Sequence, residues 1–200
     1  MIRTTLDLML PAMISLAAIV ALATPTAGAD DLATVERATA SVHRGPNGLE
    51  VQGRVRVTAS QAIAWAVLTD YDSIDRFVSS MRESRIVGWR DGDVLVEQLA
   101  EGRLLLFKRL MRTTLKVHEE PPARIVFEDV LRKDFEHYRG EWRIDDHGAE
   151  VEIIYLVQAR PNRSIPEFIA HGMFQRTVRQ LLSEVAREVA SRAALAARQP

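Results

Sequence analysis

The stretch SIPEFIAHGMFQRTVRQLLSEVAREVASRAALAAR, residues 164–198, decides the fold. Ser164 can cap a helix, Pro166 suits its first turn, and Glu167 can complete a capping box. Six apolar residues then recur at steps of three and four, which places them on one stripe of a helix: Phe174, Val178, Leu181, Leu182, Val185 and Val189. A helix of about 25 residues is roughly 38 Å long, so it requires a broad apolar partner.

Apolar residues in the first turns of this helix do not lie on the stripe. They are Ile165, Phe168, Ile169 and Met173, and on a helical wheel they fall roughly on its far side. Gly172 gives the backbone freedom to bend. We therefore expect the start of the helix to face a different neighbour or to bend at Gly172.

Upstream of the helix the pattern is that of strands. Residues 49–57 alternate between apolar and polar side chains, and they form a hairpin with residues 35–43 around a turn at 44–48. Two short helices follow, at residues 58–68 and 74–78. Further strands are predicted at 84–90, 94–100, 104–117, 124–132, 135–144 and 151–157, with turns at Asp91-Gly92, Glu101-Gly102 and 146–148. Consecutive hairpins and one long helix indicate an α+β fold with an antiparallel sheet of about seven strands.

Two motifs resemble a known superfamily. The run VTASQAIAWAVLTDYDSIDRFVSSMRESRIVGW, residues 57–89, is similar to the opening of START-like, polyketide-cyclase and coenzyme-Q-binding proteins. RGEWRI, residues 139–144, resembles their EGEWRI, with Arg139 in place of the first Glu. The resemblance covers about residues 35–194. It implies a helix-grip fold, in which the sheet wraps around the C-terminal helix and leaves an apolar cavity for lipids, quinones or polyketides.

The first 29 residues have the features of a secretory signal peptide. A weakly positive start precedes the apolar run Leu8–Ala23, and small residues at 27–29 precede Asp30. The run is about sixteen residues, shorter than the ~20 that span a membrane. We expect cleavage after Ala29, a single domain of residues 30–200, and a periplasmic location. An uncleaved membrane anchor is the alternative.

The composition argues against several kinds of site. The chain has no cysteine, and its net charge of −1 gives no reason to expect a nucleic-acid partner. The five histidines lie in different segments without ligand spacing, so no metal site is expected: His43, His118, His137, His147 and His171. No glycine-rich nucleotide loop and no Gly-x-Ser-x-Gly elbow is present, and we expect no cofactor.

Residues 136–144 alternate in a way that allows two interpretations. His137 and Arg139 share one strand face, and Tyr138 and Trp142 share the other. In the first interpretation the charged face meets water and the aromatic face lies inside. In the second, His137 and Arg139 reach the cavity and bind a carbonyl or enolate oxygen, although burial of an unpaired arginine is costly.

The stretch from Arg103 to Lys116 contains five cations, no acid and several large apolar residues. One interpretation is a core strand with long basic side chains lying over its outer face. The other is a docking patch for anionic lipid headgroups, which would give transient contact with membrane lipid.

Seven residues are the candidates for the cavity wall and for ligand binding: Tyr71, Phe77, Phe127, Tyr155, Phe168, Met173 and Phe174. Phe168 and Met173, with Tyr71 and Phe77, are predicted to line its entrance; the alternative is that they only cap the core at one end. The function we expect is binding or transfer of a hydrophobic small molecule. The alternatives are a cyclase or aromatase acting in the same cavity, and an interaction protein with a filled core.

Overall fold

The computed structural model describes residues 35–104, 107–162 and 167–198, with side chains given for all of them except 103–104, 107–109 and 167–170. Eight strands lie in these residues. They are β1 (Thr39–Gly45), β2 (Gly48–Val57), β3 (Met81–Arg90), β4 (Asp93–Leu104), β5 (Phe107–Glu120), β6 (Arg124–Asp129), β7 (Phe135–Asp146) and β8 (Val151–Pro161). All neighbours are antiparallel, and the order in the sheet is β1-β2-β8-β7-β6-β5-β4-β3. This confirms the α+β helix-grip prediction, with eight strands where about seven were expected.

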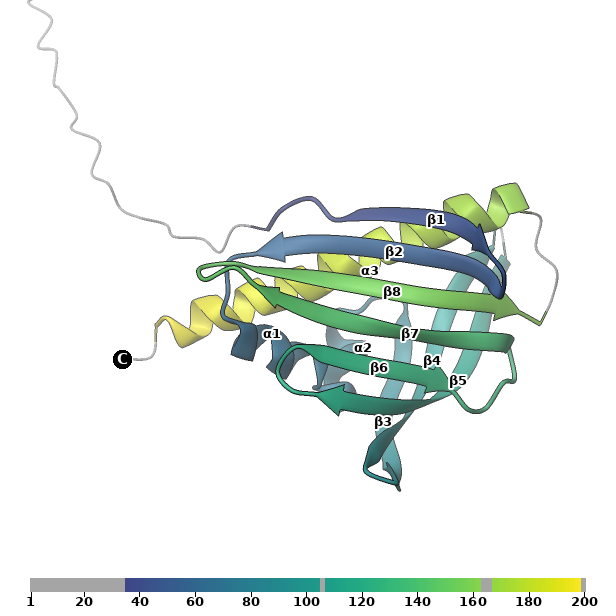
Figure 1. Ribbon diagram of the computed structural model, residues 1–200, viewed down its shortest axis with the longest axis horizontal. Coiled ribbons are helices and arrows are strands. Elements are labelled where there is room, and N and C mark those ends of the chain that lie inside the picture. Colours follow the sequence, from purple (N-terminus) through teal and green to yellow (C-terminus); the bar gives the residue numbers. More distant parts are fainter. Residues whose placement is uncertain (1–34, 105–106, 163–166, 199–200) are drawn as a thin grey trace, which may run out of the picture. The chain divides into compact units, whose positions relative to one another are not determined.

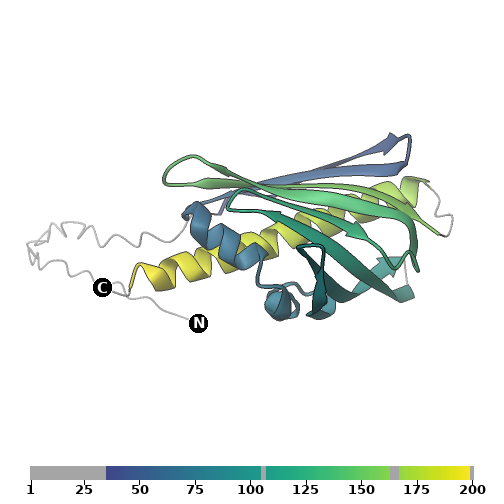
Figure 2. The ribbon, with the colours of Figure 1, turned by 60° about the horizontal axis from the view of Figure 1, so that its bottom comes forward.

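Helix α3 (Glu167–Ala196) runs along the concave side of the curved sheet (Figures 1 and 2). Four of its stripe residues are buried, namely Val178, Leu182, Val185 and Val189, while Phe174 and Leu181 are half-buried. The helix is continuous through Gly172, so no break in the helix occurs there. Ser164 and Pro166 lie outside the described residues.

Gly53 allows α3 to approach the sheet closely. A methyl group at this position of β2 would lie 2.5 Å from Leu182 Cδ1 and 2.7 Å from Val178 Cγ1, so only a residue without a side chain fits there unless the helix shifts. The position of the long helix is therefore set partly by a missing side chain in the sheet.

Between β2 and β3 the chain forms α1 (Gln61–Leu68), the 3₁₀ turn η1 (Tyr71–Ser73) and α2 (Ile74–Phe77). Ser60 caps α1, because its hydroxyl accepts a hydrogen bond from the backbone N–H of Ile63 at 3.4 Å. These pieces confirm the two short helices predicted after the first hairpin.

Several predicted boundaries were wrong by a few residues, and the structure explains two of them. Glu101 and Gly102 continue β4 and pair with β5, so the chain reverses between Leu104 and Phe107 instead. β6 ends at Asp129, three residues earlier than predicted, because the Asp129 carboxylate accepts hydrogen bonds from the backbone N–H groups of Leu131 and Arg132 and turns the chain.

Candidate functional site

A cavity of about 110 Å³ lies between the sheet, α3 and the segment formed by α1, η1 and α2. Its wall contains apolar and aromatic side chains with four polar ones, and no lining residue is charged. The lining residues are Val67, Leu68, Tyr71, Ile74, Phe77, Val78, Met81, Val96, Gln98, Leu115, Val117, Ile125, Phe127, Tyr138, Trp142, Tyr155, Leu181 and Val185.

The alternation of the strands explains which side chains reach this cavity. On β4, Val96 and Gln98 point inward, whereas Glu97 between them points outward and pairs with Arg85 and Arg112. The same period places Leu115 and Val117 of β5 on the inner face. The concave side of the sheet is apolar because every second residue of these strands points inward and most of these residues are apolar.

Four aromatic rings from β6, β7 and β8 form one wall. The ring of Phe127 stacks on Tyr155 with centroids 6.0 Å apart, and Trp142 lies 4.4 Å from Tyr155. Tyr138 lies 5.7 Å from Phe127. Gly140 pairs with Phe127, and a methyl group on it would lie 2.7 Å from Phe127 Cζ, so the glycine makes room for this ring. The wall offers flat π surfaces to a ligand.

The three tyrosines that line the cavity make two hydrogen bonds through their hydroxyls. The Tyr138 and Tyr155 hydroxyl oxygens are 3.1 Å apart, and burial raises the pKa of both groups above its ordinary value. The Tyr71 hydroxyl donates to Glu119 Oε1 at 2.7 Å, and its pKa is raised by burial first and by Glu119 second. All three side chains are therefore neutral phenols at neutral pH.

The segment Asp70–Ser80, which we call the roof, covers the cavity and is held to α3 and β3 by polar contacts. Glu184 of α3 accepts hydrogen bonds from Ser79 Oγ at 2.6 Å and Ser79 N at 3.1 Å. Arg192 pairs with Asp70 at 2.8 Å, and Asp72 accepts from the backbone N–H of Ile86 at 2.7 Å. The roof thus lies opposite the middle and the last third of α3.

This placement changes the expected entrance. Tyr71, Phe77, Phe127 and Tyr155 line the cavity, as predicted from the sequence. Met173 and Phe174 are half-buried but are not among the lining residues, because the roof contacts α3 at Glu184 and Arg192, well beyond its first turns. Phe168 lies where side chains are not described. The ligand-binding role of these residues remains a prediction.

Five further lining residues that matter for recognition or for the fit of α3 were not predicted from the sequence. Gln98, Tyr138 and Trp142 are lining residues, and Leu181 and Val185 contribute from α3. The inward alternation of residues 138, 142 and 144 was visible in the sequence, but the sequence does not reveal which alternate residues of neighbouring strands meet.

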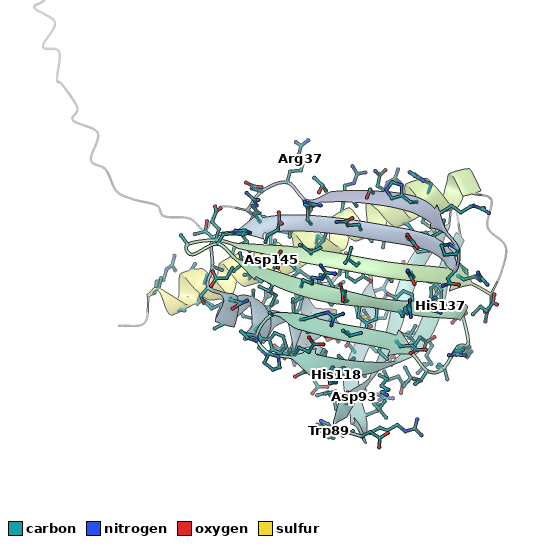
Figure 3. All side chains as sticks on the ribbon, viewed as in Figure 1. Arg37, Trp89, Asp93, His118, His137 and Asp145 are labelled. Carbon is teal, nitrogen blue, oxygen red and sulfur yellow. The ribbon has the colours of Figure 1, made fainter. Side chains whose placement is uncertain are left out.

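The charged face of β7 lies outside the cavity. Arg139 is exposed and its Nε donates to Gln158 Oε1 at 3.1 Å, and His137 is half-buried near the start of the strand (Figure 3). Neither residue lines the cavity, so the first interpretation of this strand is correct. A bulge at Glu136 places Phe135 and Tyr138 on the inner face. His137 Nε2 is buried and has no hydrogen-bond partner among the described residues.

On the outer face of β5, two cations of the basic stretch are paired with acids. Arg112 pairs with Glu97, and Lys116 Nζ lies 3.1 Å from Asp93 Oδ2. His118 Nδ1 lies 2.7 Å from the other Asp93 oxygen (Figure 3), and the His118 and Lys116 hydrogen bonds lower the pKa of Asp93. These contacts support the interpretation of long basic side chains over the outer face of a core strand. The side chains of Arg103, Lys108 and Arg109 are not described.

The described residues contain no group of three or more histidines or acids that could hold a metal ion. None of the helices that the structure describes is both long and apolar enough to cross a membrane.

Comparisons with solved structures find the same fold in lipid-transfer proteins and in aromatase/cyclases. A STAR-related lipid transfer protein from Xanthomonas axonopodis is 16% identical with a TM-score of 0.63, and the match covers 80% of this chain and 99% of that one. The Zhui aromatase/cyclase from Streptomyces sp. R1128 is 15% identical with a TM-score of 0.58, covering 75% and 96%. Human StAR-related lipid transfer protein 5 is 9% identical with a TM-score of 0.60, covering 81% and 88%.

At such low identities the structural likeness shows the fold alone and does not identify a ligand. A search of curated protein sequences found no significant match. Residues 57–186 match the family model described as "Polyketide cyclase / dehydrase and lipid transport". This segment is more than half of the chain and contains every residue that lines the cavity. The chain therefore belongs to the polyketide cyclase/dehydrase and lipid transport family.

Proposed function

We propose that the protein binds or transfers a hydrophobic small molecule, such as a lipid, a quinone or a polyketide-like compound. The observation that carries this proposal is the uncharged cavity between the sheet and α3. A ligand that moves from water into it gains about 25 cal/mol for each Å² of apolar surface removed from water. The mechanism is sequestration, and it requires no reaction.

The volume of the cavity limits what fits without rearrangement. An engineered apolar cavity of roughly 150 Å³ in another protein holds one benzene molecule. A cavity of about 110 Å³ is smaller, so it takes at most a single ring or a short chain. A larger ligand requires the roof to move, and α2, with only four residues, is a small element to displace.

A cyclase or aromatase is the second candidate. The hydroxyls of Tyr138 and Tyr155 favour it, because a phenol in the cavity can bind or protonate a substrate carbonyl. General acid–base catalysis also needs a base, and the described lining residues include no histidine, arginine or carboxylate. The raised pKa of both tyrosines makes them weak candidates for this role. Binding without a reaction explains the residues of the cavity wall better than catalysis does.

The periplasmic location is part of the proposal and is supported by the sequence of residues 1–29. If a signal peptide is removed after Ala29, the protein isolated from the periplasm of a Gram-negative host begins at Asp30. N-terminal sequencing checks this. A protein that keeps Met1 and sediments with the inner membrane would be an anchored protein instead.

Contact with membrane lipid would allow the ligand to enter without crossing water. Leu110 is 55% exposed, and Val130 and Leu131 are 42% exposed. Val130 and Leu131 form the loop patch. The backbone N–H of Val130 donates to Thr114 O at 2.9 Å, so the loop after β6 lies beside β5. Arg132 and Lys133 follow directly, and such cations complement anionic headgroups.

The ligand itself is the direct test of the proposed function. We would purify the protein from its native periplasm without detergent, record its native mass spectrum, and analyse a solvent extract. A hydrophobic compound bound at one copy per chain is expected. A protein that is consistently free of any such compound, also after incubation with a periplasmic lipid extract, would contradict the proposal.

A further inference from the structure

The hydroxyls of Tyr138 and Tyr155 leave one proton without an acceptor. Each phenol has one proton and can accept hydrogen bonds. The two groups share a single bond of 3.1 Å, in which one donates and the other accepts. In the described part of the chain neither hydroxyl has a further hydrogen-bond partner. One O–H donor of the pair is therefore unused inside an apolar cavity, where an unmade hydrogen bond is costly.

The surroundings of this donor limit the charge of a ligand. None of the described lining residues carries a positive charge, so a carboxylate or phosphate would be buried without a counterion. At the roof end, the Tyr71 hydroxyl donates to Glu119, so a carboxylate lies next to this lining residue. A negative ligand would be disfavoured both by desolvation and by this acid. The side chain of Gln98 adds an amide, whose Nε2 donates to Ser84 Oγ at 3.3 Å.

The shape of the cavity limits the size and form of the ligand. The rings of Phe127, Tyr138, Trp142 and Tyr155 form the wall beside the hydroxyl pair. Aromatic rings pack best against flat π systems in offset or tilted arrangements. A volume of about 110 Å³ limits the ligand to at most one ring and excludes a long acyl chain unless the roof opens.

We propose that the cavity selects a neutral ring compound that carries a carbonyl or a similar acceptor oxygen, and that the Tyr138–Tyr155 pair donates its unused proton to that oxygen. This inference rests on the proposed function, since it names the chemical class that the same cavity takes. It separates ring ketones and quinones from fatty acids and phospholipids by charge and by hydrogen bonding.

Three single-ring probes of similar size test the selection. Acetophenone has a carbonyl, cumene replaces that oxygen by a methyl group, and benzoate carries a negative charge. Each is titrated into the full domain at pH 7 and followed by the methyl NMR signals of Val96, Val117 and Val185, which line the cavity. Acetophenone is expected to bind about three- to tenfold more tightly than cumene, the range of one net hydrogen bond. Benzoate is expected to bind at least tenfold more weakly than acetophenone.

The variants identify the donor. The single changes Tyr138→Phe and Tyr155→Phe each leave one phenol with a free proton, so each keeps a preference for acetophenone. The double variant removes both protons and is expected to bind the two neutral probes equally. Tyr71→Phe is the matched comparison. Its proton is already donated to Glu119, so this change alters both affinities by the same factor and keeps their ratio.

The outcomes separate this inference from the proposed function. If wild type binds acetophenone and cumene with equal affinity, the pair is satisfied by a water molecule only, and the inference is wrong while the binding function stands. Tight binding of benzoate would also overturn it. If neither neutral probe shifts the cavity signals, both the inference and the proposed function fail. Urea melts show whether each variant is folded, and if the double variant is misfolded, the wild-type preference for acetophenone over cumene and over benzoate decides the inference.

Discussion

Glu184 is a buried carboxylate that binds Ser79 of the roof. Its oxygens accept hydrogen bonds from the backbone N–H and the hydroxyl of Ser79, and Gln180 Nε2 donates to it at 3.1 Å. We expect Glu184→Ala to lower the free energy of unfolding by about 1–3 kcal/mol, because it leaves buried donors without an acceptor. Chemical denaturation measures this.

The control is Glu188→Ala, four residues along the same helix. Glu188 pairs with the partly exposed Arg192 at 2.8 Å, so its removal should cost less than about 1 kcal/mol. Equal losses in the two variants would mean that Glu184 is not the anchor of the roof.

Asp129 makes stability depend on pH. It is 1% exposed, and its pKa is raised by burial, although the backbone N–H groups of Thr114, Leu131 and Arg132 donate to it and oppose the shift. The charge of Asp134 raises it further. A carboxyl with a higher pKa in the folded state binds more protons when folded. Its stabilising effect is full below about pH 4, the ordinary range for an aspartate, and is lost as pH rises through the folded pKa.

We therefore expect the free energy of unfolding of wild type, minus that of Asp129→Asn, to fall as pH rises above about 4 and then to level off. Urea melts at a series of pH values between 3 and 8 give this difference. A difference that stays constant or increases with pH would show that the folded pKa is not raised.

The sequence could predict individual residues of the cavity only where a large aromatic side chain also lay on the apolar face given by the hydrophobic period of its element. Tyr71, Phe127 and Tyr155 were selected because they are large, aromatic and on apolar faces, and all three line the cavity. Met173 was selected by position, from its place off the stripe of α3. It does not line the cavity, because the roof is held by Glu184 and Arg192, whose partners are roof residues about 105 and 122 positions away in the chain. Pairings across such separations leave no local pattern.

At the scale of elements, the packing of α3 on β2 depends on Leu182 and Gly53. Leu182 is fully buried, and the sheet has no side chain beneath it at Gly53. We expect Leu182→Ala to lower the free energy of unfolding by about 2–5 kcal/mol, because it leaves a void in a packed core. Urea denaturation measures the loss.

Leu195→Ala on the same helix is the control, because Leu195 is 56% exposed. We expect it to change stability by less than about 0.5 kcal/mol. A small loss for Leu182→Ala as well would place α3 away from the sheet and would contradict the helix-grip arrangement.

The types of the elements were predictable because the spacing of apolar residues is clear. The boundaries of the elements were less predictable, as β4 and β6 show. Glu101-Gly102 has turn-forming residues, yet it pairs with Arg109 and Leu110 in the middle of a hairpin, since Arg103 and Leu104 continue the strand. β6 was predicted to reach Arg132, because Leu131 continued its alternation. The side chain of Asp129 ended the strand instead, and Arg132 adopts a positive φ of 51°. Hydrogen bonds from side chain to backbone decided this boundary.

At the scale of the whole molecule, the loop patch is expected to dock on anionic membranes. The domain should sediment with vesicles that contain phosphatidylglycerol, and less so with pure phosphatidylcholine or at high salt, because the electrostatic attraction is screened. Leu131→Asp should reduce this binding several-fold, since it places a negative charge among the exposed apolar residues.

Leu195→Asp makes the same change at another exposed leucine, which lies outside the loop patch, and it should sediment as wild type does. If the two variants behave alike, or if wild type does not sediment at all, the loop patch is not a membrane surface. A Leu131-dependent dimer in light scattering would instead identify it as a contact between two copies of the chain.

The central claim is that a hydrophobic ligand occupies the cavity beneath the roof, and filling that cavity tests it most directly. Leu115 is buried and lines it on β5, whereas Leu156 lies on the outer face of β8. Cumene is titrated calorimetrically into wild type, Leu115→Trp and Leu156→Trp, with circular dichroism to verify that all are folded. Binding to wild type and Leu156→Trp, with loss in Leu115→Trp, is the predicted result. Undiminished binding in a folded Leu115→Trp would place the ligand elsewhere and contradict the claim.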